Sequence, residues 1–63
     1  MNYSNTEFIK WINEYIHSDR DRLILYERFV NGLTFAELSD KFYLSERQIK
    51  RIVKKADPFL LHM

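Results

Sequence analysis

Two helix-start signals stand eleven residues apart in the middle of the chain and restrict its fold strongly. Thr34 precedes Glu37 by three residues, and Ser45 precedes Gln48 by three. In such a capping box the hydroxyl accepts a hydrogen bond from the third backbone N–H of the helix, and the Glu or Gln side chain accepts one from the N–H of the cap residue. Each signal predicts a helix that begins directly after its cap, so that a very short connection joins two helices.

The two helices are predicted over about 35–42 and 46–56, with a turn at Tyr43-Leu44. So short a connection allows only a tight angle between them. Apolar residues from both helices can close a small shared core; they are Leu38, Phe42, Leu44, Ile49, Ile52 and Val53. This is the arrangement of a helix-turn-helix, whose second helix can enter the major groove of DNA.

The second of these helices is strongly basic, although the chain as a whole is nearly neutral. Between residues 45 and 55 there are five basic side chains and one acidic side chain, a local charge of +4. The rest of the chain carries five basic and eight acidic side chains, a charge of −3. A basic element on a mildly acidic body is typical of nucleic-acid binding, and net charge alone conceals it.

Length and composition limit the remaining choices. A chain of 63 residues has room for one domain, 1–63, without cysteine for a disulfide or a thiolate metal site. Its 46% hydrophobic content favours a folded core, and one glycine and one proline leave little scope for hairpins. No apolar run approaches the roughly 20 residues of a membrane span, and no signal peptide is visible. We therefore expect a cytoplasmic, helical protein with no membrane partner.

Two further helices are predicted ahead of the capped pair, so the expected fold class is all-α with four helices. The first, about 5–17, follows a third capping box of Ser4 and Glu7, with Tyr3 and Phe8 at the staple positions. Its apolar stripe is broad and comprises Phe8, Ile9, Trp11, Ile12, Tyr15 and Ile16. We interpret this stripe as a cover for the helix-turn-helix core, with contact to a second subunit as the alternative.

The second helix, about 19–31, is predicted to begin at a cap formed by Ser18 or Asp19. Gly32, the only glycine, stands where a left-handed residue would end that helix. Its predicted inward residues are Leu23, Tyr26 and Val30, with Leu25 and Phe29 beside them.

The end of the chain is apolar. Asp57-Pro58 predicts a helix end near Ala56 or Asp57, because the residue before a proline is disfavoured in helical geometry. The tail 59–63 either folds back onto the first helix or packs against another chain. A homodimer through the N-terminal helix and this tail is the corresponding prediction.

Residues 22–56 resemble the helix-turn-helix domains of LuxR-type regulators and of sigma factor region 4, and are similar to the Mor-type activators of phages and mobile elements. The matching segments are Asn31-Gly32-Leu33-Thr34, Glu37-Leu38-Ser39 and Leu44-Ser45-Glu46-Arg47-Gln48-Ile49-Lys50. Ser39 stands where these domains most often have Ala, and Tyr43 where the simplest ones have Gly. LuxR-type domains continue into a dimerisation helix, whereas the extra helix of this chain precedes the motif. The resemblance implies a bacterial or phage transcription regulator.

By this resemblance, the start and exposed face of the last helix would contact the base edges of DNA. The predicted base contacts are Ser45, Glu46, Arg47, Lys50 and Arg51, and the predicted phosphate contacts are Thr34, Lys54 and Lys55. Arg47 and Arg51 are the expected bidentate readers of guanine, and Gln48 is less well aimed. The simpler interpretation is a solvated helix face, but the helix dipole disfavours a cation such as Arg47 in the first turn.

Nothing in the sequence supports catalysis, a cofactor or a metal, since His17 and His62 have no partner at ligand spacing. Asp19 and Asp21 are interpreted as a charged helix start. Most of the four tyrosines are expected in the core; they are Tyr3, Tyr15, Tyr26 and Tyr43. We predict sequence-specific binding of double-stranded DNA in transcription regulation, with no enzyme activity. The alternative is a small interaction module, for example a factor that binds RNA polymerase without reading bases.

Overall fold

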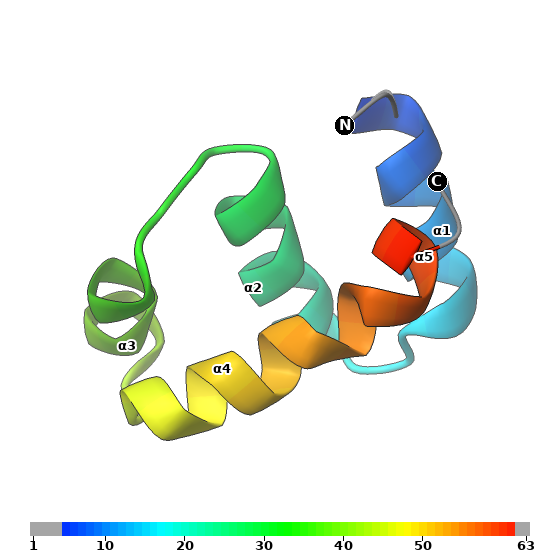
Figure 1. The fold of residues 1–63 in the computed structure, drawn as a ribbon. Helices are drawn as coiled ribbons and strands as arrows, with labels where there is room; N and C mark the ends of the chain where they lie inside the picture. The colour runs from blue at the N-terminus through cyan, green and yellow to red at the C-terminus, as the bar shows by residue number, and fades with distance from the viewer. Residues whose placement is uncertain (1–4, 62–63) are drawn as a thin grey trace.

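The computed structural model describes residues 5–61, which form helices joined by short connections, with no strand in that range. Its elements are α1 (Asn5–Tyr15), α2 (Asp19–Phe29), α3 (Phe35–Phe42), α4 (Glu46–Val53), the 3-10 turn η1 (Lys54–Ala56) and α5 (Asp57–Leu61). Helix α2 packs against α1, α3 and α4, and α4 runs along one edge of the molecule from α3 towards α1 and α5 (Figure 1). The predicted all-α class is confirmed. None of the described helices is long and apolar enough to span a bilayer.

Helices α3 and α4 begin where the capping boxes predicted. Thr34 Oγ1 accepts the Glu37 N–H at 3.1 Å, and the Glu37 carboxylate accepts the Thr34 N–H at 2.8 Å. The Ser45 hydroxyl accepts the Gln48 N–H and the Gln48 carbonyl accepts the Ser45 N–H, both at 3.1 Å. Each box satisfies two N–H groups that a helix start would otherwise leave unpaired.

The first two helices each end two residues earlier than predicted, at Tyr15 and Phe29. Ser18 is the cap of α2, since its hydroxyl accepts the Asp21 N–H at 3.3 Å. Gly32 has a φ of +75°, as its position after the helix predicted. The third predicted capping box cannot be compared, because its cap residue, Ser4, and its staple residue, Tyr3, lie outside the described residues.

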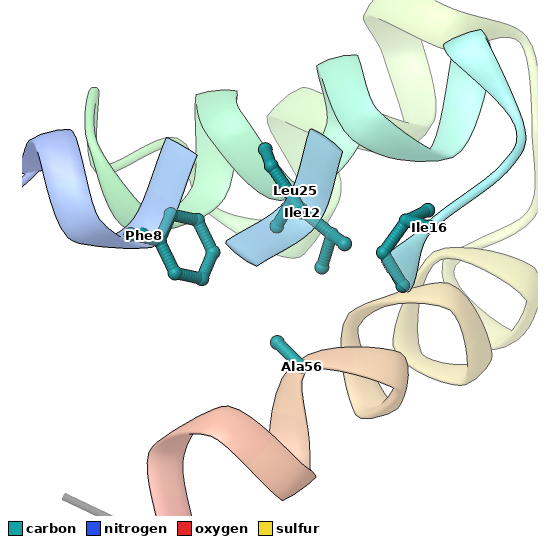
Figure 2. Close-up of a cluster of buried hydrophobic side chains, with 5 residues drawn as sticks. All are labelled: Phe8, Ile12, Ile16, Leu25 and Ala56. Carbon is teal, nitrogen blue, oxygen red and sulfur yellow. The ribbon is translucent and has the colours of Figure 1, made fainter. Parts of the chain in front are cut away.

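The core consists of two clusters that share α2. The first joins buried residues of α1 to α2 and to the end of η1; these are Phe8, Ile12, Ile16, Leu25 and Ala56 (Figure 2). The second lies within the helix-turn-helix and holds Ile24, Leu38, Ile49 and Ile52, with Leu33, Phe35, Phe42, Leu44 and Val53 packed around it. The predicted shared core of the capped helices is confirmed. The sequence predicted that the apolar stripe of α1 would cover this core. The stripe instead packs beside it, in the first cluster.

Three residues expected in the core are exposed instead. Leu23 is 55% exposed, Tyr15 58% and Tyr43 93%. In α2 the buried positions are Asp21, Ile24 and Leu25, so the inward face is rotated by about one residue from the predicted stripe. Tyr43 is the left-handed cap that ends α3, outside both core clusters.

The predicted helix stop before the proline is wrong. The α-helical pattern of α4 does end at Val53, but the chain continues through η1 into α5 with Asp57 still in helical geometry. Pro58 falls in the first turn of α5, where a missing N–H removes no intrahelical hydrogen bond. The ring of Phe59 lies 5.4 Å from those of Phe8 and Trp11, which confirms that this part of the tail folds back onto α1. Residues 62–63 lie outside the described range.

Candidate nucleic-acid interface

The candidate interface is the exposed side of α4, whose opposite side anchors the helix in the second core cluster. Ile49 and Ile52 are buried there. The predicted contact residues on this helix and on η1 are all exposed; they are Ser45, Glu46, Arg47, Lys50, Arg51, Lys54 and Lys55. Arg47, Arg51 and Lys54 form no ion pair with any residue in the described range. The helix therefore presents cations that are free to meet an anionic partner.

The two cap hydroxyls in the predicted contact set already have backbone partners. Ser45 and Thr34 each accept an N–H of the helix that follows. The Gln48 carboxamide turns back towards Ser45, so it points along the helix start and not outward. The side chains in the first turn of α4 that project freely are thus Glu46 and Arg47.

An aromatic ring of α3 brings cations from two other helices together. The Arg28 guanidinium lies 4.5 Å from the centre of the Phe35 ring, and Lys50 Nζ lies 5.6 Å from it. Arg28 also donates a hydrogen bond to the Leu33 carbonyl at 2.9 Å. Such cation–ring contacts restrict the directions that the two charged groups take. No local sequence signal predicts this cluster, because Phe35 is separated from Arg28 by seven residues and from Lys50 by fifteen.

Lys55, predicted as a phosphate contact, has an anionic partner inside the chain. It donates a hydrogen bond to the carboxylate of Asp21, and Asp21 is only 2% exposed. The same carboxylate accepts a hydrogen bond from the Arg20 guanidinium at 3.3 Å. Asp21 is therefore more than the charged helix start that the sequence suggested. A concavity opens beside this cluster, between the start of α2 and α4. It is lined by Arg20, Leu44, Gln48, Arg51, Ile52 and Lys55.

The turn between α3 and α4 is fixed by Ser39. Its hydroxyl donates to the Leu44 carbonyl, and its own carbonyl accepts the Leu44 N–H at 3.2 Å and the Tyr43 N–H. An alanine at this position could not make the hydroxyl bond. Ser39 thus helps to hold the start of α4 at a defined angle to α3.

Two carboxylates near α3 are held in their charged form by hydrogen bonds. The bond from Lys41 lowers the pKa of Glu27 from its ordinary value, and a second bond from Asn31 adds to this. The backbone N–H of Thr34 lowers the pKa of Glu37 in the capping box. Neither group points to acid–base chemistry, since both serve as acceptors that position α3.

Comparison with known families identifies the fold. Residues 18–56, more than half of the chain, match Sigma-70, region 4. The chain belongs to the sigma-70 region 4 family. This is a family of DNA-binding helix-turn-helix domains that act in transcription, and it is not a family of enzymes. DNA and RNA polymerase are the partners that the family suggests.

The region 4 match begins at Ser18, the cap of α2, and ends at Ala56, the last residue of η1. It therefore includes the whole helix-turn-helix and leaves α1 and α5 outside. It supports the sigma-factor side of the resemblance, and no comparison supports the LuxR-type or Mor-type side. Neither the curated proteins nor the solved structures gave a match.

Proposed function

We propose that residues 1–63 form one domain that binds double-stranded DNA with sequence specificity, with α4 in the major groove, in the cytoplasm of a bacterial or phage-infected cell. The supporting observation is the exposed side of α4 and η1, where Arg47, Arg51 and Lys54 have no anionic partner in the described range. Phosphates supply most of the affinity for a cationic surface, and base edges supply the specificity.

The proposed contacts divide between two regions: the start and exposed face of α4 for bases, and the cap of α3 together with η1 for phosphates. Base contacts are assigned to Ser45, Glu46, Arg47, Lys50 and Arg51, and phosphate contacts to Thr34, Lys54 and Lys55. Arg47 and Arg51 lie one helical turn apart, so both can point into one groove. Lys54 is the better probe of a phosphate contact, since replacing Lys55 would also leave the buried carboxylate of Asp21 with one partner fewer.

The test begins with selection of bound duplexes from a random library. Arg47→Ala should then lose about 1–3 kcal/mol of binding free energy on the selected duplex and little on a scrambled one, because a bidentate base contact is lost. Lys54→Ala should weaken binding to both duplexes alike. It should also lower the salt slope, the slope of log affinity against log salt concentration, by about 1, since one phosphate fewer is neutralised. Lys10→Ala on α1 is the matched control, exposed and far from α4 in the sequence, and should change neither value.

The competing function is an interaction module that uses the same fold without reading bases. RNA polymerase is the partner that the family suggests for it. Identical behaviour of Arg47→Ala and Lys54→Ala on both duplexes would refute base reading by Arg47. If neither substitution changes duplex binding, α4 is a solvated face and the interaction module is the better proposal.

The homodimer stays a prediction, and part of the surface that suggested it is used within the chain. Phe59 packs against Phe8 and Trp11 of the same molecule. Tyr15 remains exposed on α1. Sedimentation at micromolar concentration, with and without a duplex, tests the prediction, and a strict monomer under both conditions would rule it out.

A further inference from the structure

Tyr43 combines a backbone conformation that glycine usually adopts with an aromatic side chain that lies in solvent. Its φ is +58° and its ψ +40°, and it is the one non-glycine residue with positive φ in the described range. A side chain with a Cβ disfavours this left-handed region, which glycine adopts without cost. The tyrosine is also 93% exposed, so it contributes almost nothing to the core. The left-handed backbone serves the turn as the cap of α3, whereas the exposed phenol has no packing role and is available for contact with another molecule.

The surrounding turn holds Tyr43 in one place. The Ser39 carbonyl accepts the N–H groups of Tyr43 and of Leu44, and the Ser39 hydroxyl donates to the Leu44 carbonyl. Leu44 packs against the second core cluster directly after Tyr43, and Ser45 then caps α4. The backbone of Tyr43 is thus held by Ser39 and by the packed side chain of Leu44, while its own side chain projects from the turn.

The position of this turn identifies a chemical partner. It joins α3 to α4 at the end of the molecule farthest from α1 and α5 (Figure 1). In helix-turn-helix complexes the second helix enters the major groove by its N-terminal residues, while the first crosses the sugar–phosphate backbone. The turn between them must then lie at the rim of the groove, where the phosphates run. Tyrosine is one of the side chains that bind phosphate oxygens.

We propose that Tyr43 is a DNA backbone contact, with its phenol O–H donating a hydrogen bond to a phosphate at the groove rim. This inference rests on the proposed function and adds a neutral contact to the charged ones on α4. A neutral donor differs from a lysine in one measurable way. Its loss weakens binding without releasing a counterion, so the salt slope of the affinity should not change.

The test uses Tyr43→Phe and Tyr43→Gly in the full chain, with a short mixed-sequence duplex as the probe, because the contact is to the backbone. Both substitutions should raise Kd about tenfold at unchanged salt slope, as expected for loss of a hydrogen bond to a charged group. Tyr43→Gly should at the same time unfold at the same or a higher temperature, because glycine relieves the left-handed strain. Tyr15→Ala is the control for loss of an exposed tyrosine elsewhere, and should bind like the parent.

Three results would overturn the inference. If Tyr43→Gly melts at a lower temperature than the parent, the residue has a structural role. If the parent binds the duplex and either variant binds it equally well, the phosphate contact is wrong while DNA binding stands, and a protein surface becomes the partner to examine. If the parent chain binds no duplex, selected or mixed, the proposed function and the contact fail together.

Discussion

Lys55 and Asp21 form an ion pair that spans thirty-four residues and joins η1 to the first turn of α2. The carboxylate is almost completely buried, and Arg20 approaches it from the neighbouring position at 3.3 Å. Through this pair the segment that follows α4 is tied to the body of the domain. A buried carboxylate depends on such partners, because its desolvation is costly when they are removed.

The first prediction concerns this ion pair. Lys55→Gln should lower the free energy of unfolding by about 1–3 kcal/mol, because the buried carboxylate keeps only Arg20 as its cationic partner. The same substitution in an Asp21→Asn background should cost much less. Urea denaturation of the four proteins measures the coupling energy, with Lys54→Gln as an exposed, unpaired control. Equal costs in both backgrounds would mean that the pair does not stabilise the fold.

The second prediction concerns the corner between α3 and α4. Leu44→Asp should unfold the domain, because it places an unpaired charge against the second core cluster. Ser45→Ala, which removes only the cap hydroxyl, should cost about 1 kcal/mol. Thermal melts of both variants check this, and a Leu44→Asp protein as stable as the parent would contradict the observed turn.

The third prediction concerns acid. Hydrogen bonds from Thr34 lower the pKa of Glu37, and that from Lys41 lowers the pKa of Glu27. A carboxyl with a lower pKa in the folded than in the unfolded state adds stability above its unfolded pKa and loses it as the pH falls through the folded pKa. The domain should therefore lose stability as the pH falls from about 5 to about 3.

Glutamine variants separate these two contributions. Glu37→Gln keeps an acceptor for the capping box but does not titrate, so its melting temperature should fall less steeply with acid than that of the parent. Glu27→Gln should do the same for the contact with Lys41. Glu14→Gln, at an exposed site of α1, is the control and should follow the parent curve. Parallel curves for all four proteins would show that these bonds carry no pH dependence.

The helix starts could be predicted because capping is local. Thr34 with Glu37, and Ser45 with Gln48, satisfy their bonds within four residues and need no knowledge of the rest of the chain. The inward face of α2 could not be predicted in the same way. Residues 23–26 are four apolar side chains in succession, which cover a full helical turn, so periodicity could not choose Ile24 over Leu23. Packing against α3 and α4 made the choice.

The exposed basic side of α4 could likewise be predicted from spacing, since Ile49 and Ile52 define the buried side. What Lys50 and Lys55 contact could not, because Phe35 and Asp21 stand fifteen and thirty-four residues away. For the left-handed backbone of Tyr43 the sequence offered one indirect signal, a tyrosine where the simplest helix-turn-helix domains have Gly, but the bonds by which Ser39 closes the turn could not be predicted. The long-range partners of charged side chains become apparent only in the folded structure.

The first core cluster has a consequence for where this domain can be cut. The family match covers residues 18–56, yet Leu25 and Ala56 within it share a buried cluster with Phe8 and Ile12, which precede the match. Phe59, which follows it, closes the same cluster. A fragment trimmed to the family boundaries would therefore expose a ready-made apolar surface to water. The segment that matches the family is therefore shorter than the segment that builds the core, and residues on either side of the match complete that core.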